Sequence, residues 1–162
     1  MYTGSGRNGK SKLVELMGTM LGDYKGTVPI SLVTQKRGNI GGVSPEIAAL
    51  KGIRYAVMQE PSKGMALNEG VMKELTGGDP IQGRKLFRDV ITFVPQFTLV
   101  VCTNHLFNIN TDDDGTWRRI RVCDYISKFV PKPSKNINDH QFLVDPKIDL
   151  KFKHWREIAM SL

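Results

Sequence analysis

A glycine-rich stretch near the start of the chain has the residue types that hold phosphate groups. It reads TGSGRNGKS from Thr3, and it satisfies the pattern GxxxxGK[ST]. Glycines let the backbone point its N–H groups inward around phosphate oxygens, and the N-terminus of a following helix adds to the positive field. In this pattern the lysine reaches the β- and γ-phosphates, and the hydroxyl binds Mg²⁺. We therefore predict a nucleotide-binding loop made of Gly4, Ser5, Gly6, Arg7, Asn8, Gly9, Lys10 and Ser11.

The residues after this loop have the spacing of the helix that the loop requires. Apolar residues recur at helical intervals from Leu13 to Leu21, and Gly22 ends the pattern. The alternative is an ordinary glycine loop before an amphipathic helix. A phosphate loop normally follows a buried strand, but only Met1, Tyr2 and Thr3 precede this one. We therefore expect a chain cut just after that strand, which leaves the loop without its support and the sheet with an open slot.

Candidate catalytic side chains follow two predicted strands. The run RYAVMQE predicts a strand over Tyr55–Met58, and Gln59 and Glu60 come directly after it. The run FTLVVCTN predicts a strand covered on both faces, which ends at Asn104. Because α/β proteins place ligands at this edge of the sheet, Glu60 is a candidate base for activating water and, with Ser11, a candidate Mg²⁺ ligand. Asn104 is a candidate contact for water or the γ-phosphate. The alternatives are a solvated acid and a turn-forming asparagine.

A basic turn between two short strands is a candidate nucleic-acid contact. The stretch IQGRKLFRDVITFVP predicts strands on either side of this turn, with cations next to an aromatic ring. Such a tip suits both a nucleic-acid backbone and its bases. The alternative is an exposed charged turn with Phe87 folded back onto the core. The candidate DNA-binding residues are Arg84, Lys85 and Arg88.

A second cluster of cations follows an acidic loop, Asp112–Asp114. It consists of Arg118, Arg119 and Arg121. Arginine is suited to reaching phosphate charge across an interface. The alternative is a solvated cluster paired with the neighbouring aspartates.

The remaining pattern predicts a soluble α/β protein. Ser44 and Pro45 open a short helix that runs to Leu50, and Asn68 caps a helix that buries Val71, Met72 and Leu75. Strands alternate with such helices along the chain. The 162 residues are 40% hydrophobic, which fits one globular domain. No apolar run approaches the ~20 residues that cross a bilayer. We expect an intracellular protein without a membrane partner, in which Cys102 and Cys123 are reduced core thiols.

The order of these motifs resembles that of the superfamily 3 helicases. The similarity is greatest to the poxvirus-type primase-helicases of large DNA viruses, with related phage and plasmid replication proteins. The segments that carry it are GSGRNGKS, RYAVMQEP, KELTGGDPIQGRKLF, LVVCTN and DGTWRRIRV, from Gly4 to about Val122.

The resemblance implies an AAA+ P-loop ATPase with a mainly parallel sheet and a β-hairpin insertion. Such a module forms a homo-hexamer around single-stranded or forked DNA and moves with 3′-to-5′ polarity, here in a host cytoplasm or nucleus. ATP and Mg²⁺ are the implied cofactors. By this resemblance Lys10 holds phosphates, Glu60 polarises water and Asn104 senses the γ-phosphate. Arg118 or Arg119 matches the arginine finger, and the spacing does not decide between them.

One position departs from this family pattern. Many P-loop ATPases carry an aspartate before the catalytic glutamate, where it helps to hold the Mg²⁺ shell, but Gln59 stands here and contributes no charge. We assign the ATPase core to residues 1–126. Residues 127–162 are expected to form a basic, solvated linker and the start of a helical region. The alternative functions are a P-loop phosphotransferase and a nucleic-acid-binding fragment without catalysis.

Overall fold

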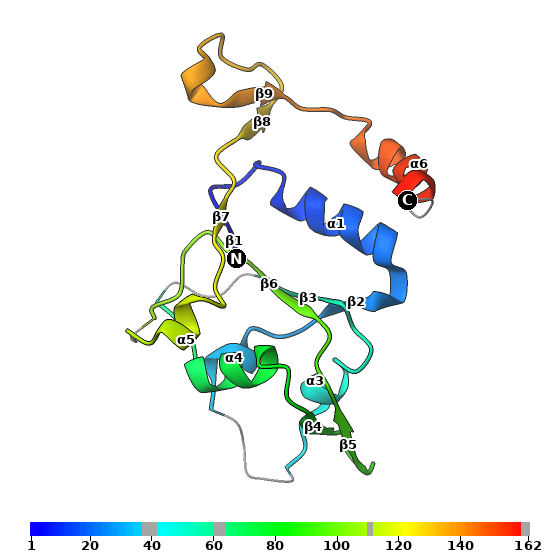
Figure 1. Cartoon of the computed structure of the whole chain (residues 1–162). Coiled ribbons are helices and arrows are strands. Elements are labelled where there is room, and N and C mark those ends of the chain that lie inside the picture. Colours follow the sequence, from blue (N-terminus) through cyan, green and yellow to red (C-terminus); the bar gives the residue numbers. More distant parts are fainter. Residues whose placement is uncertain (37–41, 60–63, 110–111, 160–162) are drawn as a thin grey trace.

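The fold is a parallel β-sheet between two helical layers (Figure 1). The structure is a computed structural model that describes residues 1–36, 42–59, 64–109 and 112–159, with side chains as far as Trp155. Helix α1 (Lys10–Leu21) covers one face of the sheet, and helices α2 (Ser31–Thr34), α3 (Pro45–Ala48) and α4 (Glu69–Thr76) cover the other. This architecture confirms the predicted α/β class. The five strands follow the order β2-β3-β6-β1-β7, with β1 (Tyr2–Thr3), β2 (Lys25–Thr27), β3 (Tyr55–Gln59), β6 (Thr98–Cys102) and β7 (Cys123–Asp124).

Strand β3 shows why the sheet is buried on both sides. Its side chains alternate between the two faces, as the geometry of a strand requires. Tyr55 and Val57 pack on the α1 side with Val14, whereas Ala56 and Met58 belong to the larger core beneath α2–α4. All four are buried. A strand covered on both faces needs a continuous apolar run, and this is the pattern from which its position was predicted.

Strand β1 occupies the slot that the sequence led us to expect open. Although it has only two residues, it pairs in parallel with both β6 and β7. The N–H of Thr103 donates to the Tyr2 carbonyl at 3.0 Å, and the N–H of Tyr125 donates to the Thr3 carbonyl at 2.8 Å. The expectation of an empty position is therefore wrong, because two residues make the pairings of a central strand at the point where the loop begins.

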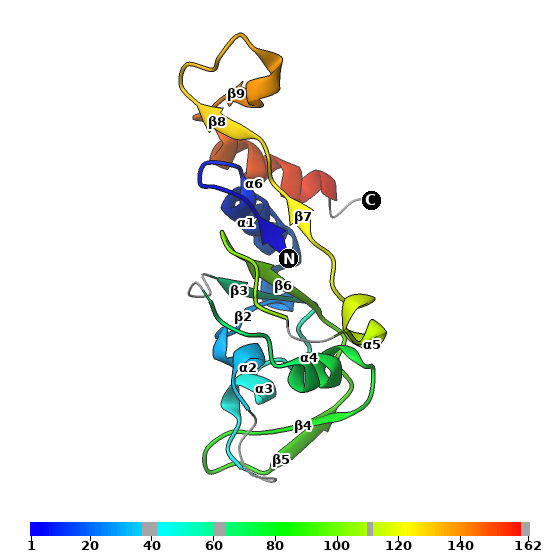
Figure 2. The same ribbon diagram turned by 90° about the vertical axis from the view of Figure 1, so that its left-hand side faces the viewer.

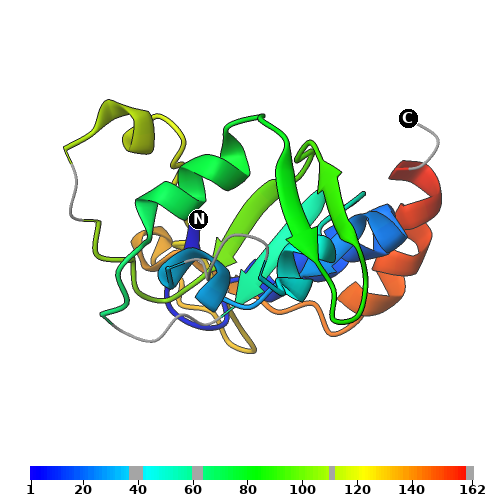
Figure 3. The same ribbon diagram turned by 90° about the horizontal axis from the view of Figure 1, so that it is seen from below.

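The helices beneath the sheet largely follow their predicted caps. In α4 the Asn68 side chain accepts from the N–H of Val71 at 3.2 Å, and the three predicted apolar residues are buried. Helix α3 begins at Pro45 as predicted and ends two residues before Leu50. Its Ser44 hydroxyl makes no helix cap and instead accepts from the N–H of Arg84 at 3.2 Å. Strands β4 (Ile81–Arg84) and β5 (Val90–Phe93) form the predicted antiparallel hairpin (Figure 3).

The chain after β7 extends past the phosphate loop and returns to α1 (Figure 2). The expected solvated linker contains strand β8 (Lys128–Val130) and a short 3-10 helix, η2 (Ile137–Asp139). Strand β8 pairs in parallel with β9 (Gln141–Leu143). Exposed Cys123 corrects the expectation of two core thiols, since it lies on the sheet's edge strand. Further helical segments are η1 (Gly22–Tyr24), α5 (Asp114–Trp117) and α6 (Ile148–Ala159).

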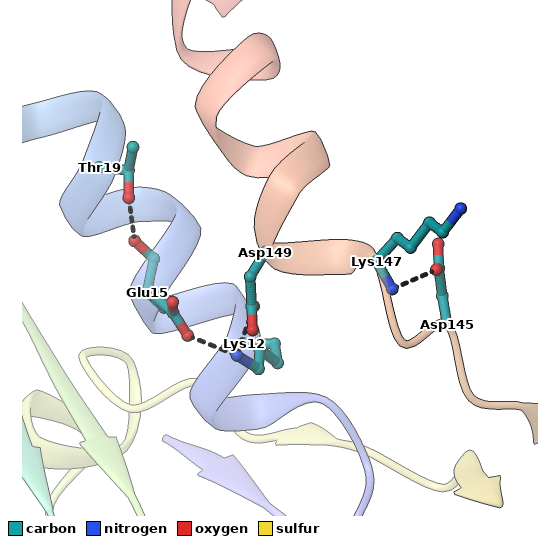
Figure 4. Close-up of polar contacts among 6 residues, drawn as sticks. All are labelled: Lys12, Glu15, Thr19, Asp145, Lys147 and Asp149. Carbon is teal, nitrogen blue, oxygen red and sulfur yellow. Dashed lines mark hydrogen bonds and ion pairs between the residues drawn. The ribbon is translucent and has the colours of Figure 1, made fainter. Parts of the chain in front are cut away.

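Helix α6 lies beside α1, so the C-terminal part of the chain covers the helix that follows the loop (Figure 4). The Lys12 ammonium lies 2.5 Å from a carboxylate oxygen of Asp149 and 2.9 Å from one of Glu15. Phe152 of α6 is buried. The two helices are thus joined at the surface by the ion pair between Lys12 and Asp149. No helix within the described ranges is long and apolar enough to span a membrane.

Candidate nucleotide-binding site and nucleic-acid hairpin

The predicted loop brings Lys10 into contact with Asn104, a residue 94 positions further along the chain. The Lys10 Nζ donates to the Gly4 carbonyl at 2.5 Å and to the Asn104 Oδ1 at 3.3 Å. Lys10 is buried, and this burial lowers the pKa of its ammonium. Gly9 takes φ +87° and ends the loop at the start of α1. The strand order explains the contact, because β1 and β6 are neighbours and their C-terminal ends lie together.

The outer side of the loop is supported by the segment that follows β7. Asn8, which is buried, donates from Nδ2 to the Tyr125 carbonyl at 3.3 Å. The N–H of Phe129 donates to the Arg7 carbonyl at 2.8 Å. A Cβ on Gly4 would lie 2.6 Å from the Tyr125 oxygen, so only glycine permits this approach. Sequence reasoning missed Tyr125 and Phe129, because no local motif signals a contact between residues as distant in the sequence as Asn8 and Tyr125, which are 117 positions apart.

A tight turn presents Asn104 to the loop. The buried Thr103 hydroxyl accepts from the N–H of His105 at 3.0 Å and donates to the His105 carbonyl. Gln59, at the end of β3, is exposed and pairs in register with Cys102 two residues before Asn104. Glu60, the predicted base, lies outside the described residues. Lys10 and Asn104 are therefore the two predicted catalytic residues that the structure brings together.

Ser11 lies exposed in the first turn of α1, next to Lys10. Its hydroxyl fits a hard cation such as Mg²⁺, which prefers oxygen ligands and keeps several waters. Within the parts of the chain that are described, no three His, Cys, Asp or Glu side chains gather into a metal cluster.

The hairpin is fixed at its base and exposed at its tip. The N–H of Ser44 donates to the Arg84 carbonyl at 2.8 Å, and Gly83 is buried against α3. A Cβ on Gly83 would lie 2.7 Å from the backbone nitrogen of Ala48. The tip follows Arg84, which is itself half-buried, and carries exposed Lys85 and Arg88.

Phe87 projects from the tip into solvent. It is 92% exposed and takes φ +56°, which is unusual for a bulky side chain. The alternative in which this ring folds back onto the core is therefore wrong. Beneath the tip lies a cleft of about 600 Å³, lined by Ala48, Ala49, Lys51, Lys85, Arg88, Asp89 and Ile91. The hairpin lies on the other side of the molecule from the phosphate loop (Figures 1 and 2).

The two candidate finger arginines, which directly follow helix α5, lie in different environments. The Asp113 carboxylate accepts from the N–H of Thr116 at 2.8 Å and lies 2.5 Å from the Lys73 ammonium. These contacts, Lys73 first, lower the pKa of Asp113 to about 2. Arg119 is half-buried and donates to the Gly115 carbonyl at 2.5 Å, whereas Arg118 is exposed. In the alternative interpretation the neighbouring aspartates pair with the arginines, but one of these aspartates, Asp113, forms an ion pair with Lys73 of α4.

Comparison with known proteins agrees with the motif order. A family model described as a family of unknown function, DUF5906, matches residues 2–119. The chain belongs to this family. It is 40% identical, over its whole length, to a "Putative helicase" of Acanthamoeba polyphaga mimivirus, and it covers 18% of that protein. It is 32% identical over 94% of its length to a "Putative helicase" of Frog virus 3, of which it covers 16%.

A third relative carries a different name. Over 91% of the chain, 33% of residues are identical to a "Putative primase" of African swine fever virus, of which the chain covers 15%. The chain thus spans less than a fifth of the length of these relatives. The predicted kinship with primase-helicases of large DNA viruses is confirmed at this level. The NrS-1 C-terminal region, solved in an apo form, shares the fold with a TM-score of 0.65 at 13% identity; the match covers 96% of this chain and 33% of that one.

Proposed function

We propose that this chain is the ATPase core of a DNA helicase motor in a viral replication protein. The observation that carries the proposal is the double contact of the Lys10 ammonium with the Gly4 carbonyl and the Asn104 side chain. It joins a phosphate-loop lysine to a polar residue on the neighbouring strand. The names of the relatives, helicase and primase, support a role in viral DNA replication. A P-loop ATPase of the AAA+ type is the finer assignment.

The chemistry follows from what these side chains can exchange. When ATP binds, the N–H groups of the loop and the α1 N-terminus surround its phosphates. The Lys10 ammonium then exchanges its bonds to Gly4 and Asn104 for oxygens of the β- and γ-phosphates. The Asn104 amide is released to orient water at the γ-phosphate, and Glu60 polarises that water. The Ser11 hydroxyl would hold a Mg²⁺ ion, which would supply neutralising charge to the phosphates.

Completion of the site from a neighbouring subunit is the second part of the proposal. Arg119 already donates to the Gly115 carbonyl within its own chain, whereas Arg118, the C-cap of α5, is exposed. We therefore favour Arg118 as the arginine finger of a homo-hexamer. Hydrolysis would depend on assembly, because the finger stabilises charge only when a neighbour docks.

The hairpin is the proposed contact with single-stranded or forked DNA. Lys85 and Arg88 supply positive charge for phosphates, and Phe87 supplies an exposed ring for bases. Its base is fixed on α3, so movement of the subunit as a body would move the tip. Alternating hydrolysis around the ring would then pull the strand with 3′-to-5′ polarity.

Hydrolysis measured with and without single-stranded DNA tests this function. In the full-length protein at assembling concentrations, we expect DNA to stimulate turnover. Arg118→Ala should reduce turnover by on the order of 10³-fold while sparing ATP binding, and Arg119→Ala should reduce it less. Unchanged turnover in both variants would contradict the interface mechanism. A rate of ATP hydrolysis that does not change when DNA is added would favour a phosphotransferase. DNA binding without ATP binding would favour a non-catalytic fragment.

A further inference from the structure

An aromatic pair lies against the outside of the phosphate loop. Phe129 of β8 and Phe142 of β9 have ring centroids 6.1 Å apart, tilted by 39°. The Phe129 ring reaches the start of α1, where its Cε2 would lie 3.4 Å from a Cβ placed on Gly9. Its backbone N–H is bound to the Arg7 carbonyl. Phe129 is thus held beside Gly9, the residue before Lys10, by contacts to the loop itself, and Phe142 packs against Phe129.

These two rings are poorly explained as core residues. Phe129 is 38% exposed and Phe142 is 50% exposed. The β8–β9 pair that carries them is a separate two-stranded sheet, and its loop, residues 131–140, is exposed throughout. Burial of the rings therefore gains only part of the free energy that a core phenylalanine would contribute. Two partly exposed aromatic faces beside a phosphate loop instead suit a planar ligand.

A nucleotide bound at this loop needs such a surface. The loop, residues 4–11, contains only glycine, serine, arginine, asparagine and lysine, so it can bind phosphates but offers no ring for a base. The sugar and base must extend beyond the loop. Phe129 is in contact range of Gly9, and base–aromatic stacking adds binding energy without requiring a hydrogen-bond pattern.

We propose that Phe129, supported by Phe142, stacks on the base of the nucleotide whose phosphates bind residues 4–11. The ligand class is a purine nucleoside triphosphate, because the purine has the larger ring face to cover. This inference rests on the proposed nucleotide-binding function. It assigns base affinity to the segment after β7, while the phosphate affinity belongs to the loop.

The test compares ATP with inorganic tripolyphosphate, which has the phosphates but no base. Affinities of the chain for both ligands are measured by calorimetry for the wild type, Phe129→Ala and Phe129→Trp. Phe129→Ala should weaken ATP binding by on the order of tenfold and leave tripolyphosphate binding unchanged. Phe129→Trp keeps a ring and should restore ATP binding. Ile137 is an exposed apolar residue in η2, which connects β8 to β9. Ile137→Ala therefore serves as the matched control.

The outcomes distinguish a failure of the base-stacking inference from a failure of the proposed nucleotide-binding function. If Phe129→Ala weakens both ligands equally, the residue only supports the loop, and the inference is wrong. It is also wrong if the wild type binds ATP and tripolyphosphate with equal affinity, or if the ATP affinity does not change in Phe129→Ala. If the wild type binds neither ligand, the proposed nucleotide-binding function itself fails.

Discussion

The phosphate loop and the hairpin tip are both basic, but they are built in opposite ways. The loop is supported from several sides: Lys10 is buried and bonded to Asn104, and Asn8 is buried and bonded to the Tyr125 carbonyl. The hairpin is fixed at its base, through Gly83 and Arg84, and its tip carries a ring that is 92% exposed.

This difference indicates two kinds of ligand. A small anion gains most from donors that are already in place, since little conformational entropy is then lost on binding. A polymer is held by separate exposed contacts along its backbone and bases, each of which is weak and sensitive to salt. We therefore expect substitutions in the loop to abolish nucleotide binding. Substitutions at the hairpin tip should each weaken DNA binding by a smaller amount.

Two glycine substitutions should disrupt the phosphate loop and the hairpin independently, and each should affect only the binding proposed for its own region. In Gly4→Ala the new Cβ would lie 2.6 Å from the Tyr125 oxygen at φ +132°, and in Gly83→Ala it would lie 2.7 Å from the Ala48 nitrogen. Strained backbone at Gly4 and overpacking at Gly83 each cost about 1–3 kcal/mol, so each affected affinity should fall by about tenfold or more. Gly4→Ala should lose ATP binding and keep DNA binding, while Gly83→Ala should do the reverse, in fluorescence titrations.

Gly70→Ala is the control for this pair. Its Cβ would make only an ordinary contact, at 3.5 Å from the Asn68 side chain. Loss of both kinds of binding in either variant would show that the regions are not independent.

Removal of positive charge from the hairpin tip should weaken DNA binding by a smaller amount, and this loss of affinity should depend on salt concentration. Lys85→Ala and Arg88→Ala each remove one expected phosphate contact. The slope of log affinity for single-stranded DNA against log salt should therefore become shallower by about 0.7 per substitution. Lys147→Ala, at an exposed position near α6, provides the comparison. An unchanged slope in both tip variants would remove the hairpin from the DNA contact.

The smallest expected effect is the release of α5 by acid. The folded protein holds the pKa of Asp113 at about 2, below the ordinary 3.8, so the charged carboxylate favours the folded arrangement. That contribution is complete above about pH 4 and is lost as pH falls toward 2. Trp117 fluorescence should report a transition in this window, because the residue lies on α5. Asp113→Asn should remove the transition, and a transition that persists in the variant must come from other groups.

The sequence predicted most of what depends on local pattern. The strand before Gln59, the Asn68 cap, the hairpin and the helix after the loop all follow from periodicity or from capping residues. It could not predict contacts that join distant segments. The role of Tyr125 at Gly4 and the use of the Ser44 hydroxyl by Arg84 depend on pairing across the fold, where no spacing rule applies. The two-residue strand β1 was missed because its pairing comes from neighbours, and its own length gives no signal.

The central claim is that Lys10 binds nucleotide phosphates, and an ATP titration of three proteins tests it most directly. Calorimetry would compare the wild type, Lys10→Ala and Lys51→Ala, the last at an exposed lysine after α3. We predict that the wild type and Lys51→Ala bind ATP equally, and that Lys10→Ala loses at least about tenfold in affinity, since a charged contact to phosphate is removed. Equal ATP affinity in all three proteins, or no ATP binding by the wild type, would contradict the account.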